Sequence, residues 1–190
     1  MPQRVYHQPV MLEEAITLLN INKGGVFVDA TIGGGGHAQK MLEEIGSEGV
    51  LVGLDQDQTA IEHCRGLFQD HRNVILERAN FRDLSFILDQ RKIKKIDGIL
   101  FDLGVSSRQL ENPQRGFSFL HDGPLDMRMD LSSGSPAAEI VNSLDARGLE
   151  QVIRDYGEER WARRIAANII AGRKDSRLDS TARLASIVAG

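Results

Sequence analysis

Acidic residues and glycines follow apolar runs in the first half of the chain, at a spacing typical of a ligand-binding sheet edge. The apolar run Val26–Val28 ends at Asp29 and leads to four consecutive glycines, Gly33–Gly36, which precede His37. Four glycines suit neither a strand interior nor a helix interior, but they suit a tight turn whose backbone approaches a ligand closely. The first and third glycines, with Ala38, also fit the G-x-G-x-x-A dinucleotide fingerprint. The stretch predicts an adenosine-cofactor site.

Asp29 distinguishes between adenosine cofactors. A phosphate-binding turn holds its anion with backbone N–H groups and the positive end of a helix, and a carboxylate directly before it would repel a pyrophosphate. The acid suits a cationic ligand with an amino group and no phosphate, such as S-adenosylmethionine (SAM). Asp55 ends the next apolar run, about twenty residues past the turn, where an acid accepts ribose hydroxyls. SAM is therefore favoured, and an NAD-dependent oxidoreductase is the alternative.

Strands and helices alternate through the first hundred residues and would position these groups. Apolar runs predict strands over 26–30, 50–54, 73–76 and 96–101, and helical spacing predicts helices over 9–19, 37–45, 58–68 and 84–88. This alternation predicts an α/β fold with a parallel sheet covered on both faces. If the strand order is 3-2-1-4, the crevice at the carboxyl strand ends collects the glycine turn, Asp55, Phe81 and Asp102.

The alternation stops after Asp102. Residues 103–135 are rich in Gly, Ser, Pro and charge and show no clear strand, so they are expected to be functional or disordered. From Ser135 the pattern is helical, with helices after Pro136, over 145–157, over 158–171 and from Thr181. We therefore predict a cofactor-binding domain over 1–105 and a motif-rich linker with a helical domain over 106–190. The apolar end of the last helix predicts that the whole protein continues past Gly190.

Two motifs after residue 114 could contact an unpaired base. Arg115, Phe117 and Phe119 combine a basic residue with two aromatic rings suited to stacking. In the next motif the charged residues Asp126, Arg128 and Asp130 alternate with apolar ones. A half-buried segment with an internal ion pair explains this second pattern equally well. Asp102 also has a second interpretation, as the N-cap of the segment that follows it.

Basic residues gather near the end of the chain. Seven of them between positions 160 and 183 stand against two acids: Arg160, Arg163, Arg164, Arg173, Lys174, Arg177 and Arg183. Arg160, Arg163 and Arg164 are predicted on one face of a helix. They could bind a phosphate backbone, and a solvated helix face is an equally good explanation.

The composition is that of an ordinary globular protein. The chain has 190 residues, 41% of them hydrophobic, and a net charge of −4, which does not by itself indicate nucleic-acid binding. It has a single cysteine, Cys64, no apolar run of membrane-spanning length and no signal peptide, so a cytoplasmic location is expected. The histidines and Cys64 lack metal-ligand spacing, so no metal site is predicted. The oligomeric state stays open.

The motifs together resemble the MraW/RsmH family of bacterial methyltransferases. The matching stretches run through most of the chain in the family's order: residues 7–11, 29–37, 102–110, 115–119, 123–130 and 156–159. The stretches after Asp102 are specific to this family, whereas the glycine turn is shared by many methyltransferases. The resemblance implies a Rossmann-like SAM-dependent methyltransferase fold, here with an incomplete sheet, and an inserted helical substrate-recognition domain.

The resemblance also implies an activity and its residues. The expected reaction is methylation of the N4 amine of a cytidine in the decoding region of 16S ribosomal RNA, with the small ribosomal subunit as partner. The implied SAM contacts are Gly35, Gly36, His37, Asp55, Phe81, Asp102 and Gln109, beside Asp29 and Gly33 of the turn. Asp102, Asp126 and Asp130 are the catalytic candidates, and Arg115, Phe117, Phe119, Arg128, Arg160 and Arg164 are the substrate-binding candidates. A non-catalytic RNA-binding module is the remaining alternative.

Overall fold

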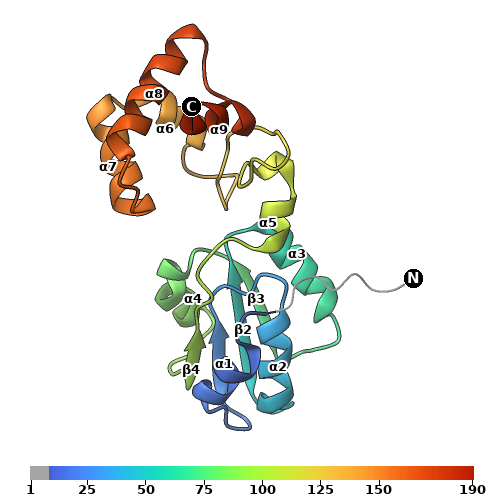
Figure 1. Cartoon of the computed structure of the whole chain (residues 1–190). Coiled ribbons are helices and arrows are strands. Elements are labelled where there is room, and N and C mark those ends of the chain that lie inside the picture. The colour runs from blue at the N-terminus through green and yellow to red at the C-terminus, as the bar shows by residue number, and fades with distance from the viewer. Residues whose placement is uncertain (1–8) are drawn as a thin grey trace. The chain divides into compact units, whose positions relative to one another are not determined.

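The computed structural model describes residues 9–190, and the chain divides into two compact units, Met1–Ser106 and Ser107–Gly190 (Figure 1). We call them unit 1 and unit 2 and describe each by itself. His7 and Gln8, at the start of the first matching motif, lie outside the described residues.

Unit 1 is a four-stranded parallel sheet with helices. Its strands are β1 (Val26–Asp29), β2 (Val50–Asp55), β3 (Val74–Arg78) and β4 (Gly98–Leu100), in the order β3-β2-β1-β4. Its helices are α1 (Leu12–Leu19), α2 (Gly36–Ile45), α3 (Gln58–Leu67), the 3₁₀ turn η1 (Phe81–Asp83) and α4 (Leu84–Gln90). The predicted α/β class, parallel pairing and strand order are confirmed, and this order is that of one half of a Rossmann-like sheet.

The two faces of the sheet bury different side chains because successive residues of a strand point to opposite sides. Phe27 and Leu51 face α1, α2 and α3, with Met41 and Ile61 in the same cluster. Their neighbours on β1 and β2, with Leu54, face α4 and the turn that leads to β4. Both faces are therefore covered, which explains why the strands read as continuous apolar runs.

The first helix begins later than predicted. Pro9 is not its first residue, because Met11 has a left-handed backbone with φ 52° and α1 starts only at Leu12. Pro9 instead lies against the glycine turn, where a Cβ on Gly36 would come within 2.3 Å of its Cγ. The start of α3 follows the usual rule, since the Asp57 side chain accepts a hydrogen bond from the backbone N–H of Thr59.

Unit 2 is helical. It contains α5 (Ser107–Glu111), the 3₁₀ turn η2 (Pro113–Arg115), α6 (Ala137–Ser143), α7 (Ala146–Gly157), α8 (Ala162–Asp175) and α9 (Thr181–Ala189). Its core consists of Leu149, Ala166, Ile169 and Leu178, with further apolar side chains from α6, α7, α8 and α9 around them. Asp145 and Ser180 cap α7 and α9 with their side chains, next to the predicted starts of these helices.

The third predicted helix of unit 2 has different bounds. It begins at Ala162 instead of residue 158, because Glu158 has a left-handed backbone with φ 50°. It also continues past Gly172 to Asp175. A Cβ on Gly172 would lie 2.6 Å from Cδ1 of Ile187, so this glycine permits α9 to pack closely on α8 and does not end the helix.

The segment before α6 is ordered, contrary to a structureless 103–135. It contains α5 and η2, and an antiparallel bridge pairs Pro124 with Ser180. Gly123 and Thr181 exchange two hydrogen bonds, and Leu125 donates its N–H to the carbonyl of Asp179. The sequence of the loop could not predict this pairing, because the partner residues lie more than fifty residues further along the chain.

Candidate functional site

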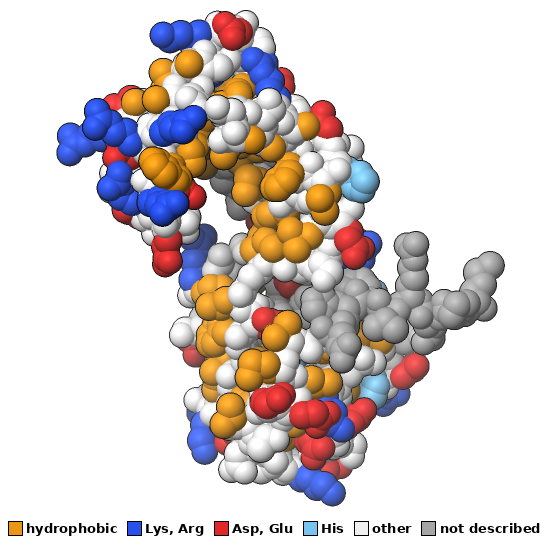
Figure 2. All heavy atoms as spheres, viewed as in Figure 1, with side chains coloured by type: hydrophobic (Ala, Val, Ile, Leu, Met, Phe, Trp, Pro, Cys, Tyr) orange, Lys and Arg blue, Asp and Glu red, His pale blue; other side chains and the backbone are white. Residues whose placement is uncertain are grey.

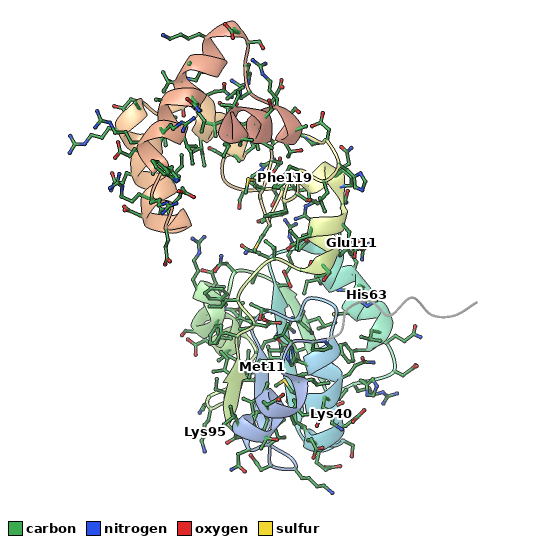
Figure 3. The ribbon with its side chains drawn as sticks, in the orientation of Figure 1. Met11, Lys40, His63, Lys95, Glu111 and Phe119 are labelled. Carbon is green, nitrogen blue, oxygen red and sulfur yellow. The ribbon has the colours of Figure 1, made fainter. Side chains whose placement is uncertain are left out.

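Three acids gather at the carboxyl edge of the unit 1 sheet. Asp29 ends β1, Asp55 ends β2, and Asp102 follows β4 by two residues. Because the strands are parallel, their carboxyl ends meet at one edge, as predicted from the strand ends. Burial raises the pKa of Asp29 most, and the negative charges of Asp55 and Asp102 add to the rise. Figure 3 shows the side chains of this unit, with Lys40 on α2 and His63 on α3 labelled.

Asp55 fixes the glycine turn. Its Oδ2 accepts a hydrogen bond from the backbone N–H of Gly33 (3.0 Å), and its Oδ1 accepts one from the N–H of Asp57 (2.8 Å). Burial raises the pKa of the Asp55 carboxyl, although these N–H donors oppose the rise. A carboxylate can accept about four hydrogen bonds, so Asp55 keeps acceptor capacity for a ribose hydroxyl.

Two glycines of the turn are required by the chain's own packing. A Cβ on Gly35 would lie 2.8 Å from Cδ2 of Leu67 on α3, and Gly35 has φ 81°. A Cβ on Gly36 would overlap the ring of Pro9. Packing against Leu67 and Pro9 therefore explains why these two positions are glycines, in addition to the predicted approach to a ligand. Their backbone contact with SAM stays a prediction.

Asp29 is the unusual group of this edge. Its side chain is 1% exposed, and its Oδ1 accepts the N–H of Thr31 at 3.2 Å. Its Oδ2 is buried and has no hydrogen-bond partner. Burial is the main reason that the pKa of Asp29 rises to about 7. A buried carboxylate oxygen without a donor is unfavourable unless a ligand supplies one, and the ammonium group of SAM is a donor of the required charge.

Asp102 and His37 lie close together near the glycine turn. Asp102 Oδ2 is 4.0 Å from Nδ1 of His37, while Nε2 of His37 is 3.1 Å from the carbonyl oxygen of Val10. The backbone N–H of Asp102 donates to Oγ1 of Thr31 at 2.7 Å. The side chain of Asp102 is 48% exposed, and α5 begins only at Ser107. Asp102 is therefore not the N-cap of that helix, and its carboxylate is available at the edge.

An aromatic pair covers part of the same unit. Phe81, predicted as a SAM contact, packs edge-to-face on Phe101 with ring centroids 5.4 Å apart. The side chain of Asn80 caps η1 by accepting the N–H of Arg82. Sequence reasoning missed Phe101 and Thr31. Phe101 was counted within an apolar strand, and its position directly before Asp102 was the available signal.

The other predicted site residues belong to unit 2. Gln109 is buried on α5. Arg115 is also buried, and its Nη2 donates to the carbonyl oxygens of Arg128 (3.0 Å) and Met129 (2.8 Å), which gives it a structural role. Phe117 lies 6.0 Å from the Arg115 guanidinium. Phe119, labelled in Figure 3, is 69% exposed. Contacts of these residues with substrate or cofactor stay predictions.

Asp126 forms the internal ion pair that was the alternative interpretation of its motif. Its Oδ2 lies 2.8 Å from Nη2 of Arg128, and its Oδ1 accepts from Nε of the same guanidinium. These bonds lower the pKa of Asp126. Asp130 accepts hydrogen bonds from Ser132 through N–H and hydroxyl. Neither arrangement tests a catalytic role.

Six of the seven basic residues separate into two groups, and Lys174 is exposed in the last turn of α8. Arg173 donates to the carbonyls of Val141 and Leu144, Arg177 pairs with Glu139, and Arg183 bonds the carbonyl of Gly172. The other group is Arg160, Arg163 and Arg164, all exposed. Arg160 is not on the predicted helix face, because it lies in the turn before α8.

Residues 9–190 contain no group of three or more His, Cys, Asp or Glu that could hold a metal ion. No helix in that range is long and apolar enough to cross a membrane.

The comparisons with known proteins cover nearly the whole chain. Proteins called ribosomal RNA small subunit methyltransferase H are 50% identical in Syntrophus aciditrophicus (strain SB), 46% in Geotalea uraniireducens (strain Rf4) and 50% in Syntrophotalea carbinolica. The alignments include 97%, 97% and 96% of this chain but 59%, 60% and 58% of those relatives. The chain thus spans just under three fifths of their length. Because the MraW methylase family profile also matches residues 4–190, this chain belongs to the MraW methylase family.

Proposed function

We propose that the whole protein is a SAM-dependent methyltransferase that methylates the N4 amine of a cytidine in the decoding region of 16S ribosomal RNA. Membership of the MraW methylase family and the names of its relatives support the reaction class and the rRNA substrate. The structural observation that carries the proposal is Oδ2 of Asp29, a buried oxygen without a donor beside the glycine turn. A pyrophosphate would be repelled there, whereas an ammonium group would be bound.

The residues of the sheet edge have distinct tasks in this proposal. Asp29 binds the amino group of SAM, and Asp55 accepts a ribose hydroxyl while it holds the turn through Gly33. Phe81 lies against the adenine. SAM supplies an electrophilic methyl group on a sulfonium sulfur, so the acceptor nitrogen must present its lone pair in line with the sulfur–methyl bond.

The nitrogen of the cytosine amine needs help, because its lone pair is conjugated with the ring. Asp102 is the first candidate to assist, since its carboxylate is partly exposed at the edge. By accepting a hydrogen bond from the amine, it would favour a tetrahedral nitrogen and stabilise the positive charge that develops there. SAM, when bound, would supply the methyl group, and the carboxylate of Asp102 would accept the proton that the amine gives up. Asp126 and Asp130 are the next candidates.

The substrate base must leave its stack to reach the edge. Flipping of a base into a pocket is the general solution for enzymes that modify it. Phe117 and Phe119 are candidate stacking partners for the extruded cytidine. Arg128 is a candidate contact to the RNA, and Arg115, which donates a hydrogen bond to the Arg128 carbonyl, is a second one. Fixing the amine against the methyl group would supply much of the rate.

Calorimetry on the 190-residue chain tests the cofactor. SAM is expected to bind and NAD is not, and binding of NAD without SAM would contradict the proposal. The reaction is tested with the full-length protein by transfer of a tritiated methyl group from SAM to small ribosomal subunits that lack the modification, followed by mass spectrometry of the nucleosides. N4-methylcytidine is the expected product.

The role of Asp102 has its own test in the full-length protein. Asp102→Ala should abolish methyl transfer, while Asp89→Ala, which removes an exposed acid on α4, should leave it unchanged. If Asp102→Ala retains both kcat and SAM affinity, Asp102 is not part of the site.

A further inference from the structure

The turn between α7 and α8 exposes the chain's single tryptophan. Trp161 is 56% exposed, and Tyr156, on the last turn of α7, is 87% exposed. The guanidinium of Arg160 lies 5.2 Å from the centre of the Trp161 ring. A large aromatic ring left in water is unfavourable for the isolated unit, and a ring that already stacks with a cation is suited to stacking with a nucleobase.

The arginines around this ring differ from five other arginines of unit 2. Arg128, Arg154 and Arg177 are each paired with a carboxylate, and Arg173 and Arg183 bind backbone carbonyls. Within residues 9–190, no ion pair joins Arg160, Arg163 or Arg164 to an acid. Figure 2 shows blue side chains with apolar ones between them in this unit.

The position of Arg163 and Arg164 is unfavourable for the helix. Both lie in the first turn of α8, where the helix dipole favours acids, and that turn contains none. Glu159, which precedes the helix, accepts the N–H of Trp161 with its side chain. Arg173 and Lys174, in contrast, occupy the last turn, where cations are favourable. Helix stability therefore does not explain the two arginines, and their place in the first turn favours a bound anion.

We propose that Arg160, Trp161, Arg163 and Arg164, here called the Trp161 surface, bind an unpaired stretch of RNA. The ring stacks on a base, and the arginines contact the phosphates on either side. The proposal rests on the proposed function, which supplies RNA as the substrate, and it assigns a contact away from the cytidine that reacts. Base stacking on an exposed ring requires an unpaired strand, so a duplex should bind less well.

Tryptophan fluorescence tests this surface directly, because Trp161 is the only tryptophan of the chain. The 190-residue chain is titrated with an unstructured RNA of about 12 nucleotides, a length within the usual range for one binding site. Anisotropy of a label on the RNA gives the affinity. Binding should quench the emission of Trp161, and the corresponding duplex should bind more weakly and quench less.

Matched variants distinguish RNA binding at the Trp161 surface from nonspecific attraction by positive charge. Arg163→Gln with Arg164→Gln should weaken binding about tenfold and make the salt dependence shallower by about 1.4 in the log–log slope. Arg154→Gln with Arg177→Gln removes the same charge from paired arginines and should change the affinity less than about twofold. Trp161→Leu should weaken binding about tenfold, and Trp161→Phe should largely restore it. Circular dichroism checks that each variant is folded.

Several outcomes would overturn the proposal. They are RNA binding with unchanged Trp161 emission, equal losses in the two double variants, equal affinity for the duplex, and competition by polyglutamate as strong as that by RNA. Absence of RNA binding would also overturn it. The proposed function is judged separately by SAM calorimetry on the same protein, so the two failures are distinguishable.

Discussion

Asp29 in unit 1 is buried and Asp126 in unit 2 is partly buried, and their surroundings move their pKa values in opposite directions. Burial without a donor for Oδ2 raises the pKa of Asp29 to about 7. The guanidinium of Arg128 lowers that of Asp126. Asp126 thus has a charged partner within the chain, whereas Oδ2 of Asp29 has no hydrogen-bond donor among the described residues. The difference separates an acid that is neutralised within the fold from an acid with an unused buried oxygen.

Asp29→Asn should give the largest effect. We expect SAM affinity to fall about 100-fold, because the ammonium group loses its counter-charge. The same change should stabilise the ligand-free unit 1 at pH 8 by about 1–3 kcal/mol, because the buried charge disappears. Calorimetry measures the affinity, and hydrogen exchange of β1 and β2 measures the stability. If Asp29→Asn lowers both the SAM affinity and the stability of unit 1, Asp29 supports the fold and is not reserved for the ligand.

Arg115→Met should destabilise unit 2 by about 2 kcal/mol, because the carbonyls of Arg128 and Met129 lose their donor. Urea unfolding followed by Trp161 emission reports on this unit. Arg147→Met, at an exposed position of α7, is the control and should shift stability by less than about 0.5 kcal/mol. If both variants lower the free energy of unfolding by similar amounts, Arg115 does not have the proposed structural role.

SAM affinity should rise about fivefold between pH 6 and 7.5, because ionisation of Asp29 raises it about eightfold and partial loss of the ammonium charge lowers it slightly. The pKa of Asp29 is about 7, so the carboxylate is mostly protonated at the lower pH and mostly ionised at the higher one. The amino group of SAM remains largely charged below its ordinary range of about 7.7–8.0. Calorimetry across this range checks the slope, and Asp29→Asn should flatten it. A slope that persists in the variant belongs to another group.

Asp126→Asn should have the smallest effect, about 1 kcal/mol on the stability of unit 2. The pKa of Asp126 is lowered in the fold, so its contribution is present above the ordinary value near 3.8 and is lost as the pH falls through the folded value. Urea unfolding at pH 6 and pH 3 should therefore differ less in the variant than in the parent protein. Asp155→Asn, on the exposed side of α7, serves as the control. An unchanged pH difference would contradict the pairing.

Local sequence signals predicted most of unit 1. Continuous apolar runs located the strands, and the acids at their ends located the edge, because a parallel sheet brings all carboxyl ends together. The sequence could not predict that Oδ2 of Asp29 has no hydrogen-bond donor. This depends on which backbone N–H groups near Thr31 point toward the carboxylate in the folded chain. The contact of Gly36 with Pro9 also needed three-dimensional positions.

Unit 2 was harder to predict for a physical reason. Its helices follow local rules of capping and spacing, and these placed α7 and α9 well. The errors occurred where distant residues decide. Gly172 lies inside α8 because Ile187 of α9 packs against it and leaves no room for a side chain. The loop around Gly123 is held by its hydrogen bonds with Thr181. The pairing of individual arginines likewise depended on neighbours that the sequence does not reveal.

The bonds between Gly123 and Thr181 have a consequence for synthesis of the protein. All four strands of unit 1 are complete once Leu100 has been made, so its sheet can form early. The loop of unit 2 must wait for a partner 58 residues later. At typical elongation rates of about 5–20 residues per second, that delay is about 3–12 seconds. During this interval the loop lacks the residue that bonds it, and a ribosome that stalls before Thr181 would leave the four strands of unit 1 joined to a loop without its partner.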